Sequence, residues 1–251
     1  MNYYQDLVNS DDYDWAKWSE KQRDFSPQEA NEFFVGVMLD QGQKAERAWD
    51  GAKHLIENHF NNNENFWNNI VQTSTNEVKN ICQKGFNGKS YAINFTFNTF
   101  PERLISAANK IVREYDSDVR NIWNIKSSED VIIIYNRFTE FEGIGDALAK
   151  MAQFILVRNY GVAGGKNNQK QMKIKPDILV RRVLYRTGIS SSQKTKDVIS
   201  AVEELGLKSP ADFDAASWNI GREFCLKTNP KCYECPITKS CNYSNISENT
   251  G

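Results

Sequence analysis

The sequence has no apolar run close to the roughly 20 residues that a membrane-spanning helix needs, so we expect no contact with a membrane. Its first residues, 1–14, are polar and acidic, which excludes a secretory signal there. We therefore expect a cytoplasmic protein, associated with the nucleoid if the source is prokaryotic. The chain also lacks a charge surplus, because its formal net charge is −1. By its sum alone, this charge argues against a nucleic-acid partner.

The distribution of charge points the other way. Acidic residues gather within positions 6–29, whereas basic residues follow one another over 166–196, with Asp177 as the only acid among them. A solvated loop and helix face is the ordinary explanation of such a stripe. The alternative is a surface that holds phosphates around one carboxylate.

Helical signals dominate the chain. Ser26 and Pro27 form an N-cap and first-turn signal for a mostly buried helix, which polar residues interrupt at 40–43. The alternation within 84–100 has no partner strand, so we expect a short aromatic helix or turn there. Apolar spacing predicts further helices over about 44–60, 66–82, 127–138, 147–158, 195–205 and 210–224, and from Pro101 and Pro176. Loops are expected at 61–65 and 160–173, and the fold class is all-α.

Four of the five cysteines follow the pattern C-x6-C-x2-C-x5-C near the end of the chain: Cys225, Cys232, Cys235 and Cys241. A reducing compartment disfavours disulfides, so thiols this close are expected to share a metal or a cluster. Zinc held by four thiolates is the simpler alternative, although zinc ribbons use two C-x2-C pairs and this chain has one. Cys82 stands alone and is expected to be a small buried hydrophobe.

Two further motifs precede the cysteines. Gly143 and Gly145 lie in a tight turn between two helices, where bare amides at a helix N-terminus can bind a DNA phosphate without reading bases. A G-x-G turn alone is a weak signal. Asp177 lies near a helix start, where it is either an ordinary N-cap acid or a carboxylate that stabilises an oxocarbenium-like sugar when a nucleotide loses its base.

In this order, the hairpin glycines, Asp177 and the cysteine pattern resemble the helix-hairpin-helix DNA glycosylase superfamily, in the iron–sulfur branch of endonuclease III and the mismatch adenine glycosylase. Residues 37–41 and 218–222 also fit that branch, and the resemblance covers about 32–241. It implies two helical lobes with a DNA cleft between them. The expected domains are a helical barrel ending in the hairpin, a cluster domain and a flexible tail, at 26–160, at 1–25 with 161–241, and at 242–251.

The resemblance also implies roles for single residues. Asp177 matches the essential aspartate, and Gln41 matches the glutamine that fills the space left by a flipped nucleotide. The four cysteines would bind a [4Fe–4S] cluster, and carbonyls of the hairpin can hold a monovalent cation. The expected DNA contacts, which include a basic residue beside Asp177, are Gln41, Gly143, Gly145, Lys227, Lys231 and Arg181.

Two departures from the family pattern narrow the expected chemistry. Ala147 stands where bifunctional members have a Lys, so no Schiff base and no lyase step by the usual route are expected. Lys150 or Lys175 could be a substitute. Gly36 stands where the adenine glycosylases have a Glu that protonates the departing base, which counts against adenine excision. Asp40, about one helical turn further on, could face the same pocket.

The sequence therefore predicts a monofunctional DNA N-glycosylase of base-excision repair, acting as a monomer on double-stranded DNA with a damaged or mispaired base. The missing pocket acid favours a good leaving group, such as an alkylated purine, or uracil or thymine held by hydrogen bonds. Three alternatives remain open at this point. They are a bifunctional glycosylase/lyase using Lys150 or Lys175, a non-catalytic DNA lesion binder, and an electron-transfer protein.

Overall fold

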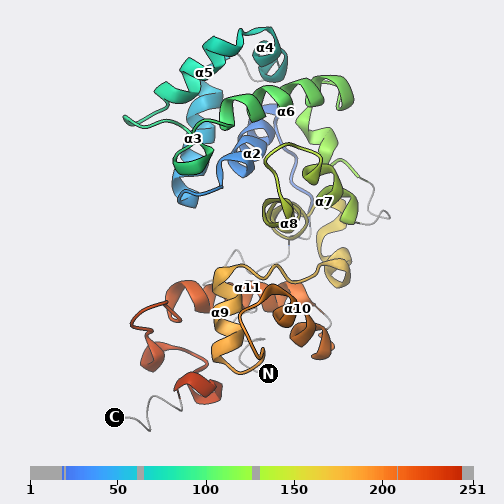
Figure 1. Ribbon diagram of the computed structural model, residues 1–251. Coiled ribbons are helices and arrows are strands. Elements are labelled where there is room, and N and C mark those ends of the chain that lie inside the picture. Colours follow the sequence, from blue (N-terminus) through green and yellow to red (C-terminus); the bar gives the residue numbers. More distant parts are fainter. Residues whose placement is uncertain (1–18, 20, 61–64, 126–130, 208, 245–251) are drawn as a thin grey trace. The chain divides into compact units, whose positions relative to one another are not determined.

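The computed structural model describes residues 19, 21–60, 65–125, 131–207 and 209–244 (Figure 1). Every regular element in these ranges is helical, and the one β contact is an isolated bridge between Phe86 and Lys89. The all-α prediction is confirmed. No helix in the described ranges is long and apolar enough to cross a membrane.

The chain forms two compact units. The first, Gln22–Leu156, is called the central unit. The second, called the cysteine unit, consists of Val157–Gly251 with residues 1–21, as far as these are described.

The central unit is built around helix α2, Pro27–Leu39, which is buried along almost its whole length. Its start is fixed by a capping box: the Ser26 side chain accepts from the Glu29 amide, and the Glu29 carboxylate accepts from the Ser26 amide. The helix packs against α3 and the short turn η3. The remaining helical elements of the unit are α3 (Ala45–Asn58), α4 (Phe66–Gln72), α5 (Thr75–Lys84), η2 (Asn94–Thr96), α6 (Phe100–Glu114), η3 (Val119–Ile122), α7 (Ile132–Thr139) and α8 (Asp146–Phe154).

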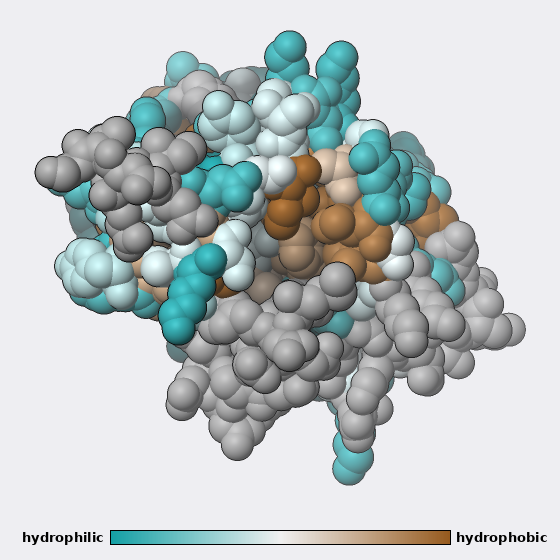
Figure 2. All heavy atoms as spheres, turned by 90° about the horizontal axis from the view of Figure 1, so that it is seen from below, coloured by the Kyte–Doolittle hydropathy of each residue, from teal (hydrophilic) through white to brown (hydrophobic). Residues whose placement is uncertain are grey.

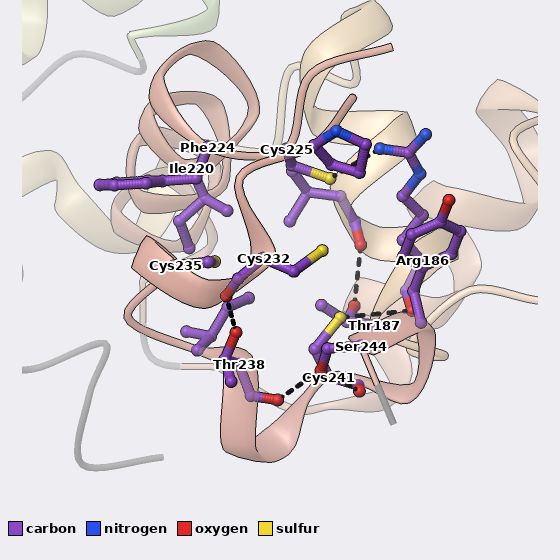
Figure 3. A pocket seen from close by; sticks show the side chains of 14 residues that line it. Arg186, Thr187, Ile220, Phe224, Cys225, Cys232, Cys235, Thr238, Cys241 and Ser244 are labelled. Atoms are coloured by element: carbon purple, nitrogen blue, oxygen red, sulfur yellow. Dashed lines mark hydrogen bonds between the residues drawn. The ribbon is translucent and has the colours of Figure 1, made fainter. Parts of the chain in front are cut away.

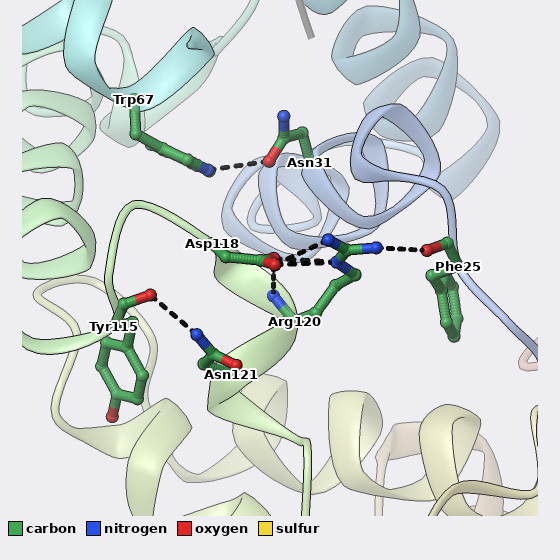
Figure 4. Close-up of polar contacts among 7 residues, drawn as sticks. All are labelled: Phe25, Asn31, Trp67, Tyr115, Asp118, Arg120 and Asn121. Carbon is green, nitrogen blue, oxygen red and sulfur yellow. Dashed lines mark hydrogen bonds and ion pairs between the residues drawn. The ribbon is translucent and has the colours of Figure 1, made fainter. Parts of the chain in front are cut away.

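Interlocking aromatic rings fill the interior of the central unit. The ring of Phe34 on α2 lies 5.6, 5.7 and 4.8 Å, centroid to centroid, from those of Trp67, Phe138 and Phe141. Edge-to-face pairs at such distances stabilise a core beyond the area that they bury. The indole Nε1 of Trp67 donates to Asn31 Oδ1 at 2.7 Å, so the polar end of the ring is also satisfied (Figure 4).

A second polar tie of the central unit fixes the segment before α2. Arg120 Nη2 pairs with Asp118 Oδ2 at 2.7 Å, and its Nη1 donates to the carbonyl of Phe25 at 3.1 Å (Figure 4). The guanidinium therefore connects η3 to the N-terminal end of α2, where the ring of Phe25 is buried.

Several sequence predictions need correction. Residues 66–82 form two helices because Ser74 caps α5 by accepting from the Glu77 amide. Helix α8 ends at Phe154 rather than near Arg158, and a π-helical turn, η4 (Ile155–Asn159), follows it. Helix α7 begins at Ile132, while the expected cap at 127–130 and most of the loop at 61–65 fall outside the described residues. The short aromatic helix or turn expected within 84–100 is present as the 3-10 helix η2, and the isolated bridge between Phe86 and Lys89 lies before it.

The cysteine unit packs α9 (Ile178–Arg186) against α10 (Thr195–Glu204) and α11 (Pro210–Glu223). Their shared core is formed by Ile174, Val180, Leu184, Val198 and Val202. Helix α9 does not begin at Pro176 as predicted, because Asp177 is its N-cap. The last two elements are the short turns η6 (Cys232–Glu234) and η7 (Thr238–Ser240).

The segment predicted as a loop at 160–173 contains a kinked run of 3-10 turns, η5 (Val162–Gln171). Gly165 has a φ of +46°, and a Cβ there would lie 2.5 Å from the carbonyl oxygen of Ser19. Only glycine allows this close approach. The Ser19 amide also donates to the Arg158 carbonyl at 2.8 Å, so residue 19 is tied to this unit.

An apolar groove remains open on the cysteine unit. It is lined by residues of α9, α11 and the segments after α10 and Cys235, among them Leu184, Leu207, Phe213 and Ile237. Figure 2 shows apolar atoms gathered around a hollow on the face seen from below.

Candidate functional site

The four clustered cysteines line one cavity of the cysteine unit (Figure 3). Cys225 follows the end of α11, Cys232 and Cys235 stand at the two ends of η6, and Cys241 ends η7. All four are free and partly buried. That they share a metal or a cluster stays a prediction, and the apolar side chains around the cavity include Val183, Ile220, Phe224 and Ile237.

The cavity has a cationic wall. Arg186 Nη1 lies 3.4 Å from Cys225 Sγ and donates to the Leu226 carbonyl at 2.7 Å. Its guanidinium also stacks on Tyr243, 4.6 Å from the ring centroid. The backbone carbonyl of the same arginine lies 3.6 Å from Cys241 Sγ. A positive charge in this position would favour an anionic, thiolate-bound group.

The surroundings of the thiols define what they could hold. Burial raises the pKa of the Cys232 and Cys235 thiols, and the neighbouring cysteines raise it further. Across the described ranges, no three His, Cys, Asp or Glu groups converge closely enough to hold a single metal ion. What the structure shows is four thiols lining one largely apolar cavity beside Arg186.

Asp177 is the N-cap of α9. Its Oδ1 accepts from the amides of Leu179 and Val180 at 2.8 and 2.9 Å. Its Oδ2 accepts no hydrogen bond from the described residues, and the side chain is partly exposed. The N-cap interpretation is therefore correct, and it leaves one carboxylate oxygen free for a substrate.

Asp214 lies behind this cap and was not singled out in the sequence. It is 2% exposed, and its Oδ2 accepts from the backbone amide of Lys175, two residues before Asp177. Burial raises the pKa of Asp214 to about 7, with Lys175 opposing and Asp177 adding to the rise. The sequence did contain one signal for a buried acid here: Asp214 falls on the same face of α11 as the apolar Ala211 and Ala215.

The hairpin lies in the central unit. Gly143 has a φ of +87°, and Gly145 is the N-cap of α8 without any side chain to cap it. A Cβ on Gly145 would meet nothing within 4 Å. The amide end of α8 is therefore open to a group that approaches from outside, as phosphate binding at a helix N-terminus requires.

Gln41 follows the C-cap of α2, and the structure links it to the hairpin through a residue that the sequence did not indicate. Gln41 Oε1 accepts from Arg103 Nη1 on α6 at 3.0 Å. The same arginine lies against Gly143. Two elements predicted separately are thus joined within the central unit.

The two lysines considered as substitutes for the missing amine differ in their contacts. Lys150 Nζ lies 2.9 Å from Asp146 Oδ1, one turn earlier on α8. Lys175 is held through its amide by Asp214, and its charge opposes the rise in the pKa of that carboxyl. Ala147 lies in the first turn of α8, where it offers no nucleophile.

Gly36 lies on α2 beneath the indole of Trp49. A Cβ on Gly36 would lie 2.2 Å from Trp49 Cε3, so the ring fills the space that a side chain would need. Asp40 is the C-cap of α2. At Gly36, where the adenine glycosylases were expected to have a Glu, the Trp49 ring thus fills the space for a side chain.

The remaining predicted DNA contacts lie at the surface of the cysteine unit. The Arg181 side chain donates to two backbone carbonyls. Its Nε lies 3.3 Å from the carbonyl oxygen of Asp177, and its Nη1 lies 3.3 Å from that of Gln193. Lys227 is exposed, and Lys231 Nζ lies 4.0 Å from Glu234 Oε2. Their contact with DNA stays a prediction.

No protein-family model and no curated protein matches the sequence. Solved structures do match. A trapped endonuclease III–DNA covalent intermediate aligns with a TM-score of 0.62 at 13% identity, covering 98% of this chain and 96% of that chain. A non-covalent endonuclease III–DNA complex gives 0.62 at 14%, covering 99% and 96%. A thermostable thymine-DNA glycosylase gives 0.58 at 15%, covering 98% of both chains. The resemblance read from the motifs is thus confirmed at the level of the fold: the chain has the helix-hairpin-helix fold of endonuclease III and thymine-DNA glycosylase.

Proposed function

We propose that the protein is a DNA N-glycosylase of base-excision repair that acts on double-stranded DNA carrying a damaged or mispaired base. The observation that carries this proposal is the geometry of Asp177. Two backbone amides fix one of its oxygens, and the other accepts no hydrogen bond from the described chain. A carboxylate oriented in advance suits the stabilisation of positive charge that develops on a substrate.

The reaction that fits this geometry is hydrolysis of the N-glycosidic bond. The bond between base and sugar breaks, its electron pair leaves with the base, and the sugar gains oxocarbenium character. Asp177 stabilises that charge. A water oxygen then bonds to the same carbon, and the water releases a proton.

Ala147 and the pairing of Lys150 support a monofunctional enzyme. A Schiff base needs a free amine near the sugar carbon, whereas Lys150 is paired with Asp146. The backbone amide of Lys175 donates to the buried carboxyl of Asp214. With Ala147 at the usual lysine position, water is the remaining nucleophile.

The open hairpin supports DNA as the partner. The amide end of α8 at Gly145 would bind a phosphate, and the carbonyls near Gly143 could hold a monovalent cation. Gln41 would fill the space left by the flipped nucleotide. Lys227, Lys231 and Arg181 would add phosphate contacts, and the enzyme would act as a monomer.

The thiol cavity fits a [4Fe–4S] cluster held by Cys225, Cys232, Cys235 and Cys241. The spacing C-x6-C-x2-C-x5-C has one C-x2-C pair where zinc ribbons use two, which favours a cluster over a single zinc ion. The bound cluster would connect the segments after α11 without taking part in the reaction. Arg186 would balance its negative charge, and the loop of Lys227 and Lys231 would be held in one conformation.

The closed space at Gly36 supports a substrate base that leaves without a pocket acid. Trp49 occupies the place of such an acid. An alkylated purine carries positive charge and leaves readily, and uracil or thymine could be held by hydrogen bonds. Adenine excision is the least favoured outcome.

The test is base release from a panel of duplexes that carry alkylated purines, uracil or thymine mismatches, and adenine mismatches. We expect release from at least one of the first two groups. Asp177→Asn should reduce release by about 10²–10³-fold, since one oriented charge in the transition state is lost. DNA binding with no release from any duplex would instead indicate a lesion-binding protein.

Borohydride trapping separates the two enzymatic mechanisms. A monofunctional enzyme gives no covalent DNA adduct. A trapped adduct that disappears in Lys150→Ala or Lys175→Ala would establish a lyase and overturn the hydrolytic mechanism.

A further inference from the structure

Arg103 connects two parts of the central unit that come together only in the fold. From α6 it donates through Nη1 to Gln41 Oε1, which lies at the end of α2. Its Cδ, Nε and Cζ lie 2.6, 2.8 and 3.0 Å from where a Cβ on Gly143 would be. Position 143 therefore favours glycine for two reasons. Its φ is positive, and the Arg103 side chain fills the space that a Cβ would occupy.

The charge of Arg103 is not neutralised by the protein. Within the described ranges, no carboxylate lies within ion-pair distance of it, whereas Arg113 on the same helix pairs with Glu114. Its Nε is buried without a hydrogen-bond partner. Buried donors are nearly always satisfied in folded proteins, so this guanidinium has hydrogen-bonding capacity that the protein does not use.

The geometry of the donors defines the ligand that could use this capacity. Nη1 donates to Gln41, and Nε is buried against the hairpin, so Nη2 is the donor that remains for an outside ligand. A guanidinium nitrogen binds a phosphate or carboxylate oxygen through a charge-assisted hydrogen bond. The neighbouring Gly145 begins α8 without a side-chain cap, and such a helix start favours an anion.

We propose that Arg103 is a DNA-binding residue that binds the phosphate at the hairpin and holds Gln41 in place from the same guanidinium. This inference rests on the proposed function, because it names DNA as the source of the phosphate. It makes the backbone contact and the filling of the flipped-base space interdependent. Loss of the arginine would weaken both.

The first test is the salt dependence of binding to a duplex with a reduced abasic site, measured for wild type, Arg103→Gln and Arg113→Gln. Each phosphate contact contributes about 0.9 to the slope of log affinity against log salt. We expect Arg103→Gln to lower the slope by about this amount and affinity by roughly tenfold at low salt. Arg113→Gln, exposed and paired with Glu114, should leave both unchanged. An unchanged slope in Arg103→Gln would overturn the proposal.

The second test is a double-mutant cycle with Gln41→Ala, which measures the link between the two side chains. We expect Gln41→Ala to weaken binding in wild type and to have little further effect in Arg103→Gln. Arg103→Lys, which keeps the charge and α6 packing, should retain the salt slope while losing most of the coupling to Gln41. Additive effects of the two substitutions would contradict the proposal that Arg103 holds Gln41 in place.

The controls separate this inference from the proposed function. Wild type that releases a base but shows no difference between Arg103→Gln and Arg113→Gln would remove only the role of Arg103. Wild type without DNA affinity would remove both proposals. Far-ultraviolet circular dichroism of each variant verifies that the helices are intact.

Discussion

The two units differ in what they bury. Among the described residues, the interior of the central unit contains no charged side chain and is filled by aromatic and aliphatic groups around Phe34 and Trp67. The cysteine unit buries four charged residues: Arg158, Arg182, Asp212 and Asp214. Buried charges are costly unless they are paired, and Arg158 pairs with Asp212 while Arg182 donates to the carbonyls of Cys225 and Gly221.

The comparison assigns different tasks to the two interiors. The aromatic core of the central unit stabilises a scaffold that carries the hairpin and Gln41. The polar interior of the cysteine unit holds the backbone just before Asp177, because Asp214 accepts from the Lys175 amide. Substitutions in the two interiors should therefore differ in their effects on the free energy of unfolding and on its pH dependence.

Trp67→Ala is expected to have the largest effect on stability. It removes a fully buried ring that contacts Phe34 and donates to Asn31. The expected loss in the free energy of unfolding is about 3–5 kcal/mol, measured by urea denaturation. Trp67→Phe, which keeps most of the packing, should lose clearly less. Equal losses for both variants would show that the indole hydrogen bond, and not the aromatic packing, dominates.

Arg158→Met tests the charged interior. Arg158 Nη2 lies 3.3 Å from Asp212 Oδ1, and both side chains are buried. Removing one partner leaves the other charge buried, so we expect a loss of about 3 kcal/mol. The double variant Arg158→Met with Asp212→Leu should recover most of it. If the double variant stays as unstable as Arg158→Met, the ion pair contributes more free energy to folding than the burial of its two charges costs.

Asp214→Asn tests the coupling behind Asp177 through pH. The folded pKa of about 7 lies above its ordinary value of 3.8, so the folded state keeps a proton that the unfolded chain releases. Wild-type stability should therefore fall as pH rises from about 4 to about 7, by on the order of 1–3 kcal/mol. The variant should show a flatter profile in thermal unfolding. The same slope in both proteins would assign the pH dependence to another group.

Glu29→Ala should have the smallest effect, at the start of the central unit. The hydrogen bond from the Ser26 amide and the pairing with Arg23 lower the pKa of Glu29 to about 2. Its contribution of about 1 kcal/mol is present above pH 4.5 and lost as pH falls through about 2. Glu29→Gln, which can keep the capping box, should remain more stable than Glu29→Ala near neutral pH. A larger loss for Gln than for Ala would exclude the capping box as the source.

Local chemistry made much of this structure predictable. Ser26, Pro27 and Glu29 specify a helix start within four residues, and the cysteine spacing brings its thiols to one cavity. Cys82 is buried as expected, and burial raises its pKa to about 12. The break between α4 and α5 was missed because continuous apolar spacing concealed the cap at Ser74.

Long-range packing determined what the sequence could not indicate. Arg103 reaches Gln41 across 62 positions, and Asp214 reaches Lys175 across 39. An arginine and an aspartate are both ordinary residues on a helix. Only the tertiary arrangement shows that Arg103 has no carboxylate partner in the described residues and that Asp214 is buried. The closure of Gly36 by Trp49 is equally invisible in the spacing of either residue.

The contact between Gly36 and Trp49 also constrains how this protein can change. An acid introduced at Gly36 would place its Cβ 2.2 Å from the indole, so the substitution would displace the ring before it could protonate any base. A smaller residue at position 49 would first leave a hole beside Phe33, whose ring packs against Trp49 at 5.7 Å. Neither single replacement improves the protein by itself. A side chain at position 36 therefore requires a second change at position 49, and the two changes are tolerated only together.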